Sequence, residues 1–188
     1  MVTKRTAQVA IVNKTGKKLL SVTVAHKYSD NYKNDKTWEL IQPNETTSET
    51  MKVEYNTGFG TTGRDWWFVT WADEEGNVYS TSPQNFREIF DLFDKALTSA
   101  AEPLKTLGLL VAVGSPEPTS KTIAAAAAAT SALALTLLNS ESTTGFKQHI
   151  LRSEDSERRN NIVISNEEVS FESSSGVSKT GFKKTGTK

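Results

Sequence analysis

The stretch Asp65-Trp66-Trp67-Phe68-Val69-Thr70-Trp71 decides the fold, because it gathers three of the four tryptophans of the 188-residue chain. In an extended strand, alternate side chains point to opposite faces. One face then carries Trp66, Phe68 and Thr70, and the other carries Trp67, Val69 and Trp71. Because both faces are strongly apolar, the stretch predicts a central β-strand that is packed on both sides. The alternative is that one face fills a core, while the other offers its rings to a ligand, a membrane or a partner chain.

Short strands separated by turn sequences are predicted around this stretch. The expected strands are Ala7–Asn13, Lys18–Tyr28, Trp38–Ile41, Thr47–Tyr55 and Val78–Thr81. The turn residues between the first two predict that these strands pair with each other as a hairpin. A polar loop is expected over Ser29–Lys36. Strict alternation places one face of the second strand on Leu20, Val22, Val24 and His26.

The last third of the chain returns to a β pattern. Gly145–Arg152 alternates in polarity, and Asn161–Ser165 and Glu168–Glu172 are predicted to pair as a hairpin across Asn166-Glu167. Many short strands separated by turns are typical of a sandwich or a barrel. The fold class that we predict is therefore mainly β, an antiparallel β-sandwich.

The pattern between these two β regions is helical. Ser82-Pro83 is a typical helix start, and an apolar stripe with helical spacing follows it as far as Leu97. Lys121–Asn139 contains an alanine run and predicts a second helix. Its apolar part, Ile123–Leu138, would be about 24 Å long, which is shorter than the ~30 Å hydrocarbon core of a bilayer. We therefore expect packed helices and no conventional transmembrane span.

This order of patterns predicts one domain with an appendage. We expect a single β-sandwich domain over residues 1–172, in which 82–143 is a helical insertion. Residues 173–188 are rich in Ser, Gly, Thr and Lys, which predicts a disordered basic tail. The first residues, Met1–Gln8, lack the apolar core of a secretory signal, so a cytoplasmic location or export without a cleaved signal is expected.

The composition argues against several functional classes. Lys+Arg and Asp+Glu balance at 22 each, which disfavours a broad nucleic-acid surface. The absence of cysteine excludes disulfides, zinc–thiolate sites and thiol nucleophiles. His26 and His149 each stand alone in an apolar pattern and are predicted to be structural. Asp30, Asp35 and Glu39 do not have the spacing of a calcium loop, so neither a metal nor a cofactor is predicted.

One motif matches a cofactor pattern only in its letters. Gly58–Gly63 reads G-x-G-x-x-G, but that motif must open a helix whose N-terminus meets a pyrophosphate. Here it leads into the tryptophan stretch, which we expect to be a strand, so we interpret it as a glycine-rich β connection. With no catalytic constellation in the sequence, we predict that the protein is not an enzyme and has no catalytic residues.

Three segments are distinctive as a set, namely Val9–Asn13, Val24–Ser29 and Tyr55–Trp67. They resemble the PUD family, which is named for proteins up-regulated in long-lived nematode insulin-pathway mutants and has many fungal relatives. The resemblance covers roughly Thr6–Thr81 and, more loosely, Gly145–Phe171. It implies a β-sandwich related to aegerolysins, small proteins that recognise membrane lipids and can recruit pore-forming partners. It also implies that dimers can form, but lipid-contacting positions cannot be carried over residue by residue.

These observations predict a non-enzymatic binding module that recognises membrane lipid or a partner protein through aromatic surface residues. The candidate ligand-binding residues are Tyr55, Phe59, Arg64, Trp66, Trp67 and Trp71, followed by Lys27, Tyr28 and Trp38. The aromatic rings would supply interfacial burial, and Arg64 could bind a phosphate. One alternative is a module for homo- or heterodimerisation, in which the same rings are buried in the interface. Another is a pore former that refolds the region Leu104–Leu138 into a membrane.

Overall fold

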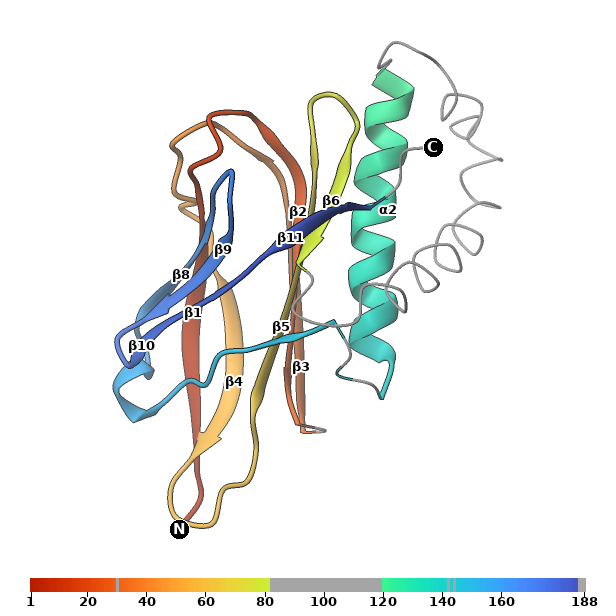
Figure 1. The fold of residues 1–188 in the computed structure, drawn as a ribbon. Coiled ribbons are helices and arrows are strands. Elements are labelled where there is room, and N and C mark those ends of the chain that lie inside the picture. The colour runs from red at the N-terminus through yellow and green to blue at the C-terminus, as the bar shows by residue number, and fades with distance from the viewer. Residues whose placement is uncertain (30, 82–119, 142, 144, 186–188) are drawn as a thin grey trace.

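The computed structural model describes residues 1–29, 31–81, 120–141, 143 and 145–185, and Figure 1 shows its elements in chain order. The first strands are β1 (Thr3–Asn13), β2 (Leu19–Tyr28), β3 (Tyr32–Ile41), β4 (Met51–Thr57), β5 (Asp65–Asp73) and β6 (Val78–Thr81). Helix α2 (Ser120–Asn139) and strand β7 (Lys147–Gln148) come next, followed by a 3-10 turn at Ser153–Asp155. The chain then forms β8 (Arg159–Ile164), β9 (Val169–Ser173), β10 (Gly176–Thr180) and β11 (Phe182–Thr185).

Two sheets face each other across a shared core. Within the described ranges, the five-stranded sheet has the order β10-β9-β8-β1-β4, and the six-stranded sheet has the order β11-β6-β5-β2-β3 with β7 beside β5. The core between the sheets takes aliphatic and aromatic side chains from both, including Ile11, Val53 and Phe171 from one and Trp67 and Val69 from the other. The predicted mainly β, two-sheet architecture is therefore confirmed.

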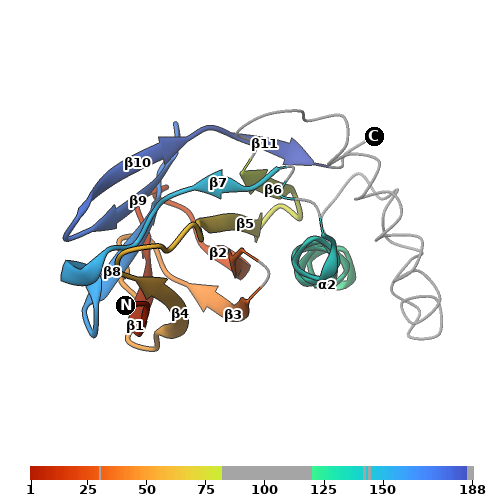
Figure 2. The same ribbon diagram turned by 90° about the horizontal axis from the view of Figure 1, so that it is seen from below.

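The tryptophan stretch is strand β5, and it is packed on both sides as predicted. Trp67, Val69 and Trp71 point into the core between the sheets. Phe68 and the half-buried Trp66 belong to a second cluster, which helix α2 supplies with Ala129, Leu133 and Leu137 among others. Figure 2 shows α2 lying on the outer side of the six-stranded sheet, against β2 and β5. The helix predicted over Lys121–Asn139 is thus confirmed, and it buries the outer face of β5.

The expected pairing of the first two strands is wrong. β1 pairs with β4 and, in parallel, with β8, whereas β2 pairs with β3 and β5. β1 and β2 lie in opposite sheets. The apolar side chains of each strand are buried against the facing sheet. By contrast, the predicted hairpin of Asn161–Ser165 with Glu168–Glu172 is confirmed as β8–β9.

A bulge changes the face assignment at the start of β2. The register between β2 and β5 shifts between Leu20 and Thr23, and Ser21 has a φ of 46°. Leu19, Val22 and Val24 therefore face the core between the sheets, while Leu20 faces the helix. The prediction that Leu20 shares a face with Val22 and Val24 is wrong, because the extra residue at a bulge reverses the faces of a strand.

Two segments that were predicted to be irregular are strands. The polar loop expected over Ser29–Lys36 is largely part of β3, in which exposed and half-buried side chains alternate. The disordered tail expected from Ser173 instead forms β10 and β11 as far as Thr185. β10 pairs with β9, and β11 pairs with β6 at the edge of the other sheet. Polar, lysine-bearing sequences are common in edge strands, which is why composition suggested disorder here.

The last strand is held by an aromatic contact. The ring of Phe182 lies 5.1 Å from that of Trp71 and 5.9 Å from that of Tyr79, edge-on in both cases. Burial and the neighbouring Asp73 raise the pKa of Tyr79 to about 12, consistent with a covered phenol. The helix predicted from Ser82 lies outside the described residues, and so do residues 104–119 of the region Leu104–Leu138.

We predict that Phe182→Ala lowers the free energy of unfolding by about 1–2 kcal/mol, because a half-buried ring is removed from an aromatic cluster. Lys184→Ala on the same strand is exposed and should change stability by less than about 0.5 kcal/mol. Urea unfolding followed by tryptophan fluorescence measures both. Equal stability of the two variants would show that β11 does not cover Trp71.

Candidate functional site

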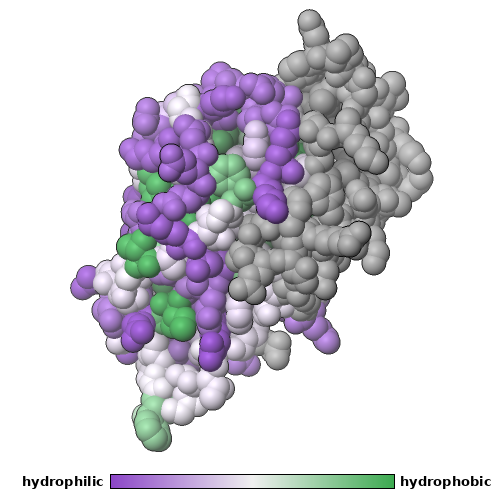
Figure 3. Space-filling view, viewed as in Figure 1, coloured by the Kyte–Doolittle hydropathy of each residue, from purple (hydrophilic) through white to green (hydrophobic). Residues whose placement is uncertain are grey.

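The loop between β4 and β5 forms an apolar tip at one end of the molecule. Phe59 is 94% exposed, and Val2 beside the loop is 55% exposed. Figure 3 shows apolar colour at this lower end, where Figure 1 places the N-terminus and the loop. A side chain at Gly58 would place its Cβ 2.2 Å from the carbonyl oxygen of Met1, and Gly58 has a φ of 118°. Glycine is therefore required where the loop passes the first residues of the chain.

The base of this loop is fixed by its neighbours. The ring of Tyr28 lies so close to Gly63 that an added Cβ would meet it at 2.1 Å. The Tyr28 hydroxyl donates a hydrogen bond of 3.1 Å to the carbonyl oxygen of Asn56, at the end of β4. Arg64 N–H donates to Ser29 Oγ at 3.2 Å, and Ser29 N–H donates to the carbonyl oxygen of Arg64 at 3.1 Å. The loop thus projects from an anchored base.

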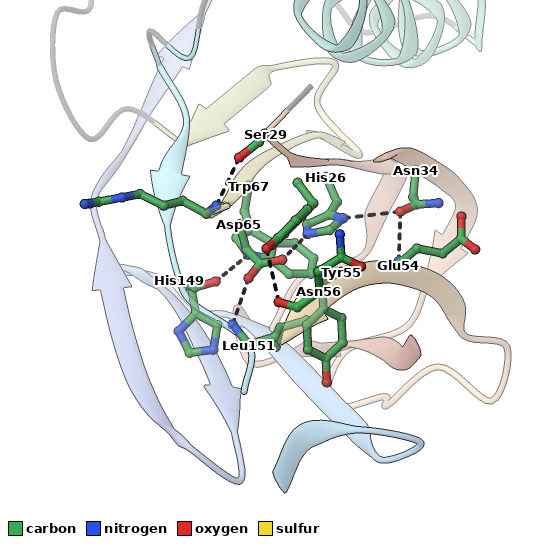
Figure 4. A network of polar contacts seen from close by, with 12 residues as sticks. His26, Ser29, Asn34, Glu54, Tyr55, Asn56, Asp65, Trp67, His149 and Leu151 are labelled. Atoms are coloured by element: carbon green, nitrogen blue, oxygen red, sulfur yellow. Dashed lines mark hydrogen bonds and ion pairs between the residues drawn. The ribbon is translucent and has the colours of Figure 1, made fainter. Parts of the chain in front are cut away.

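A buried polar network lies directly beneath that base (Figure 4). His26 Nε2–H donates to Asp65 Oδ1 at 2.8 Å, and both side chains are almost completely buried. The second carboxylate oxygen of Asp65 accepts the N–H of Leu151 at 2.9 Å. Asn34 Oδ1 lies 3.3 Å from His26 Nδ1 and accepts the N–H of Glu54 at 3.1 Å. Asp65 follows Arg64 directly, so this network fixes the residue at which the loop becomes β5.

Tyrosine and basic side chains lie near the base of the loop. The rings of Tyr28 and Tyr32 lie 6.0 Å apart. Lys4 Nζ lies 4.8 Å from the centre of the Tyr32 ring and forms a 2.6 Å ion pair with Glu54. Arg64 is exposed at the end of the loop. Tyr32, Lys4 and Arg64 thus form a collar of amphipathic and charged groups behind the apolar Phe59, whereas Tyr28 is buried beside them.

Most of the predicted binding residues lie in the interior. The exposed fractions of Trp67 and Trp71 are 2% each, that of Tyr55 is 0% and that of Trp38 is 6%. The expectation of a broad aromatic surface is wrong for these rings, because β5 is covered on both faces. Tyr28 is also buried, and Trp66 is half-buried against the helix cluster. Of the nine candidates, the structure leaves Phe59 and Arg64 exposed.

Lys27 is buried as well, and it contacts the C-terminal end of helix α2. Its Nζ donates to the carbonyl oxygen of Ser140 at 2.6 Å and lies 4.7 Å from the centre of the Phe146 ring. A cation at this position compensates the partial negative charge of the last helical carbonyls. The contact fixes the helix on β2, so Lys27 is not part of the tip.

His149 contributes to the interior beside the network. Its Nδ1 lies 3.0 Å from Ser178 Oγ, its ring stacks on Phe171, and its carbonyl oxygen accepts the indole N–H of Trp67 at 2.9 Å. Burial lowers the pKa of His149, so the neutral imidazole is favoured in the folded protein. Within the described residues, no group of three or more His, Asp or Glu side chains could hold a metal ion. None of the helices in this part of the chain has the length and apolar character needed to cross a bilayer.

Sequence reasoning missed the residues that anchor the loop. Asn34 and Leu151 contact Asp65 or His26 from distant parts of the chain, and no local motif marks them. The position of Asp65 does indicate a network, because a carboxylate at the start of an otherwise apolar strand is buried and needs hydrogen-bond donors. Tyr32 lies in the segment Ser29–Lys36, which the sequence predicts to be a polar loop, so the pattern gives it no place in a site.

The comparison with protein families identifies the chain. The family model described as up-regulated in long-lived daf-2 matches residues 3–182. The chain belongs to the PUD family. The resemblance seen in the sequence is therefore confirmed, and the match extends through the helix-containing middle of this PUD protein to the start of β11. A search of curated proteins finds none that matches it.

We predict that Asp65→Ala destabilises the protein by about 3–5 kcal/mol, because it leaves His26 and the N–H of Leu151 buried without their acceptor. Asp35→Ala removes an exposed carboxylate from β3 and should cost less than about 0.5 kcal/mol. Chemical denaturation compares the two variants. A mild effect of Asp65→Ala would contradict the anchoring role of the network.

The lowered pKa of His149 predicts a pH dependence of stability. Below the ordinary histidine pKa of about 6.5, the unfolded chain takes up a proton that the folded protein binds less readily. Stability should therefore be full above this pH and fall as the pH drops towards the folded pKa. The loss between pH 7.5 and pH 5.5, measured by urea unfolding, should be smaller in His149→Gln. An identical loss in both proteins would refute the assignment.

Proposed function

We propose that this PUD protein is a non-enzymatic binding module that contacts membrane lipid through the tip of the loop between β4 and β5. The observation that carries the proposal is the 94% exposure of Phe59 on a loop whose base is anchored. Phe59 shares this tip with Met1 and Val2, which are also exposed and lie against Gly58, and neighbouring exposed apolar side chains mark a contact surface. The tyrosine and basic collar behind it resembles the groups that settle at the interface between water and lipid.

The resemblance to aegerolysins supports the same proposal. Those proteins combine a β-sandwich with lipid recognition, and an aegerolysin-like sandwich is the finer fold that we propose for this chain. An apolar tip with a polar collar also suits a pocket on a partner protein. We favour lipid because the loop lies at the end of the molecule beside the N-terminus (Figure 1), so its apolar side chains can reach an interface while the core stays unchanged.

The expected affinity of one tip is modest. Burial of a phenylalanine contributes about 1.5–3 kcal/mol, and a basic residue near an anionic surface contributes about 1 kcal/mol. Such a sum corresponds to binding in the millimolar range. Stable attachment would therefore require several tips at once or a second contact, as it does for single lipid anchors.

Vesicle sedimentation at millimolar lipid tests the proposal, with neutral, anionic and sphingolipid-containing vesicles. Phe59→Ala should lower the partition constant of the protein by about 10- to 100-fold. Val177→Ala provides a matched control, because Val177 is 61% exposed on β10 at the far edge of the five-stranded sheet. Absence of binding to every lipid, or equal binding by Phe59→Ala, would end the lipid proposal.

A further inference from the structure

The free edge of β3 is a second surface, separate from the loop tip. β3 is the last strand of the six-stranded sheet and pairs only with β2 among the described strands. Over its length, the outward N–H and C=O groups have no backbone partner within the described residues. An edge of ten residues is long, and such edges pair readily with another extended chain.

A groove follows this edge. One part, of about 490 Å³, lies between Thr37–Leu40 and residues 45–49. The adjoining part, of about 410 Å³, lies between Lys33–Lys36 and Thr50–Lys52. Together they run along β3 from Lys33 to Leu40, with the chain entering β4 as the second wall. β3 and β4 lie side by side in Figures 1 and 2.

Side chains close the gap between the sheets behind the groove. Trp38 Nε1–H donates to the carbonyl oxygen of Glu49 at 3.0 Å, and Lys36 pairs with the Glu49 carboxylate at 3.0 Å. Asn34 accepts the N–H of Glu54 in the same way. These contacts join β3 to the chain at β4 behind the groove, so a ligand along β3 need not separate the two sheets.

The two ends of the groove carry opposite charges. Glu39 and Glu45 line one end, where Leu40 is 48% exposed. Lys33 and Lys52 line the other end, together with Asp35. Lys36 and Glu49 pair with each other where the two parts of the groove meet. Charges on an edge strand suppress indiscriminate pairing. Their separation into an acidic and a basic end selects one kind of chain and one direction for it.

We infer that this groove binds an extended segment of a partner protein, which adds to β3 as a further strand. The segment would be about eight residues long, with basic residues at the acidic end and acidic residues at the basic end, and a small apolar residue beside Leu40. Residues 45–52 stand beside the edge as a second wall that the whole sheet edge of a second copy would have to pass, which favours a single extended peptide.

Fluorescence anisotropy with labelled, end-blocked peptides tests the inference in the full-length protein. One peptide has three lysines in its first half and three glutamates in its second half, separated by threonine and valine, and another has the halves exchanged. We expect one order to bind at least tenfold more tightly than the other. Peptides with alternate N-methylated residues should not bind, because strand addition uses main-chain hydrogen bonds.

The variant Glu39→Lys with Glu45→Lys should weaken the preferred peptide at least tenfold. Glu154→Lys with Glu167→Lys makes the same charge change at exposed positions away from the groove and should have little effect. The inference is overturned if neither peptide binds at millimolar concentration, or if both charge variants weaken binding equally. It is also overturned if light scattering shows a dimer that Glu39→Lys dissociates, since a second copy would then occupy the edge.

Discussion

Burial of β5 on both faces is the constraint on which the rest of the structure depends. A strand that carries Trp67 and Trp71 on one side and Trp66 and Phe68 on the other cannot be stable with either side in water. The five-stranded sheet covers the first face, and helix α2 covers the second. The protein therefore needs its helical segment to complete the exterior of the six-stranded sheet, which explains why a helix interrupts an otherwise β sequence.

The candidate surfaces follow from this arrangement. Because the tryptophans are used for packing, the candidate contacts in the described part of the chain lie at an end and an edge of the sheets. At one end, Asp65 joins β5 to the network of His26 and Asn34, so the loop that holds Phe59 starts from a fixed point. At one edge, β3 has backbone groups without a backbone partner among the described residues, beside a groove with charged ends. The two surfaces are linked through Asn34, which belongs to the network and also lines the groove.

The strands were largely predictable from the sequence, whereas their pairing was not. Alternation and turn residues identified the regions of β1, β2, β4, β5, β8 and β9, since these signals are local. The partners of β1 are set by contacts across more than forty residues of sequence, as in the pairing of Val9 with Met51. Ser21 illustrates a second limit, because a bulge reverses the faces of β2 without any glycine to mark it. Charged edge strands such as β3 and β11 resemble loops in composition, and only their neighbours show that they are ordered.

The candidate site was predictable only where the local sequence indicates exposure. Phe59 and Arg64 lie in a glycine-rich loop and remain exposed, as loop residues usually are. The aromatic residues of the strands attracted the same functional interpretation, but ring type alone does not distinguish a surface from a core. Native-state hydrogen exchange of the Asp65–Asp73 amides tests the central claim most directly. Burial on both faces predicts that these amides exchange only through global unfolding, with the full stability of the protein. Exchange through local opening at a fraction of that free energy would contradict it.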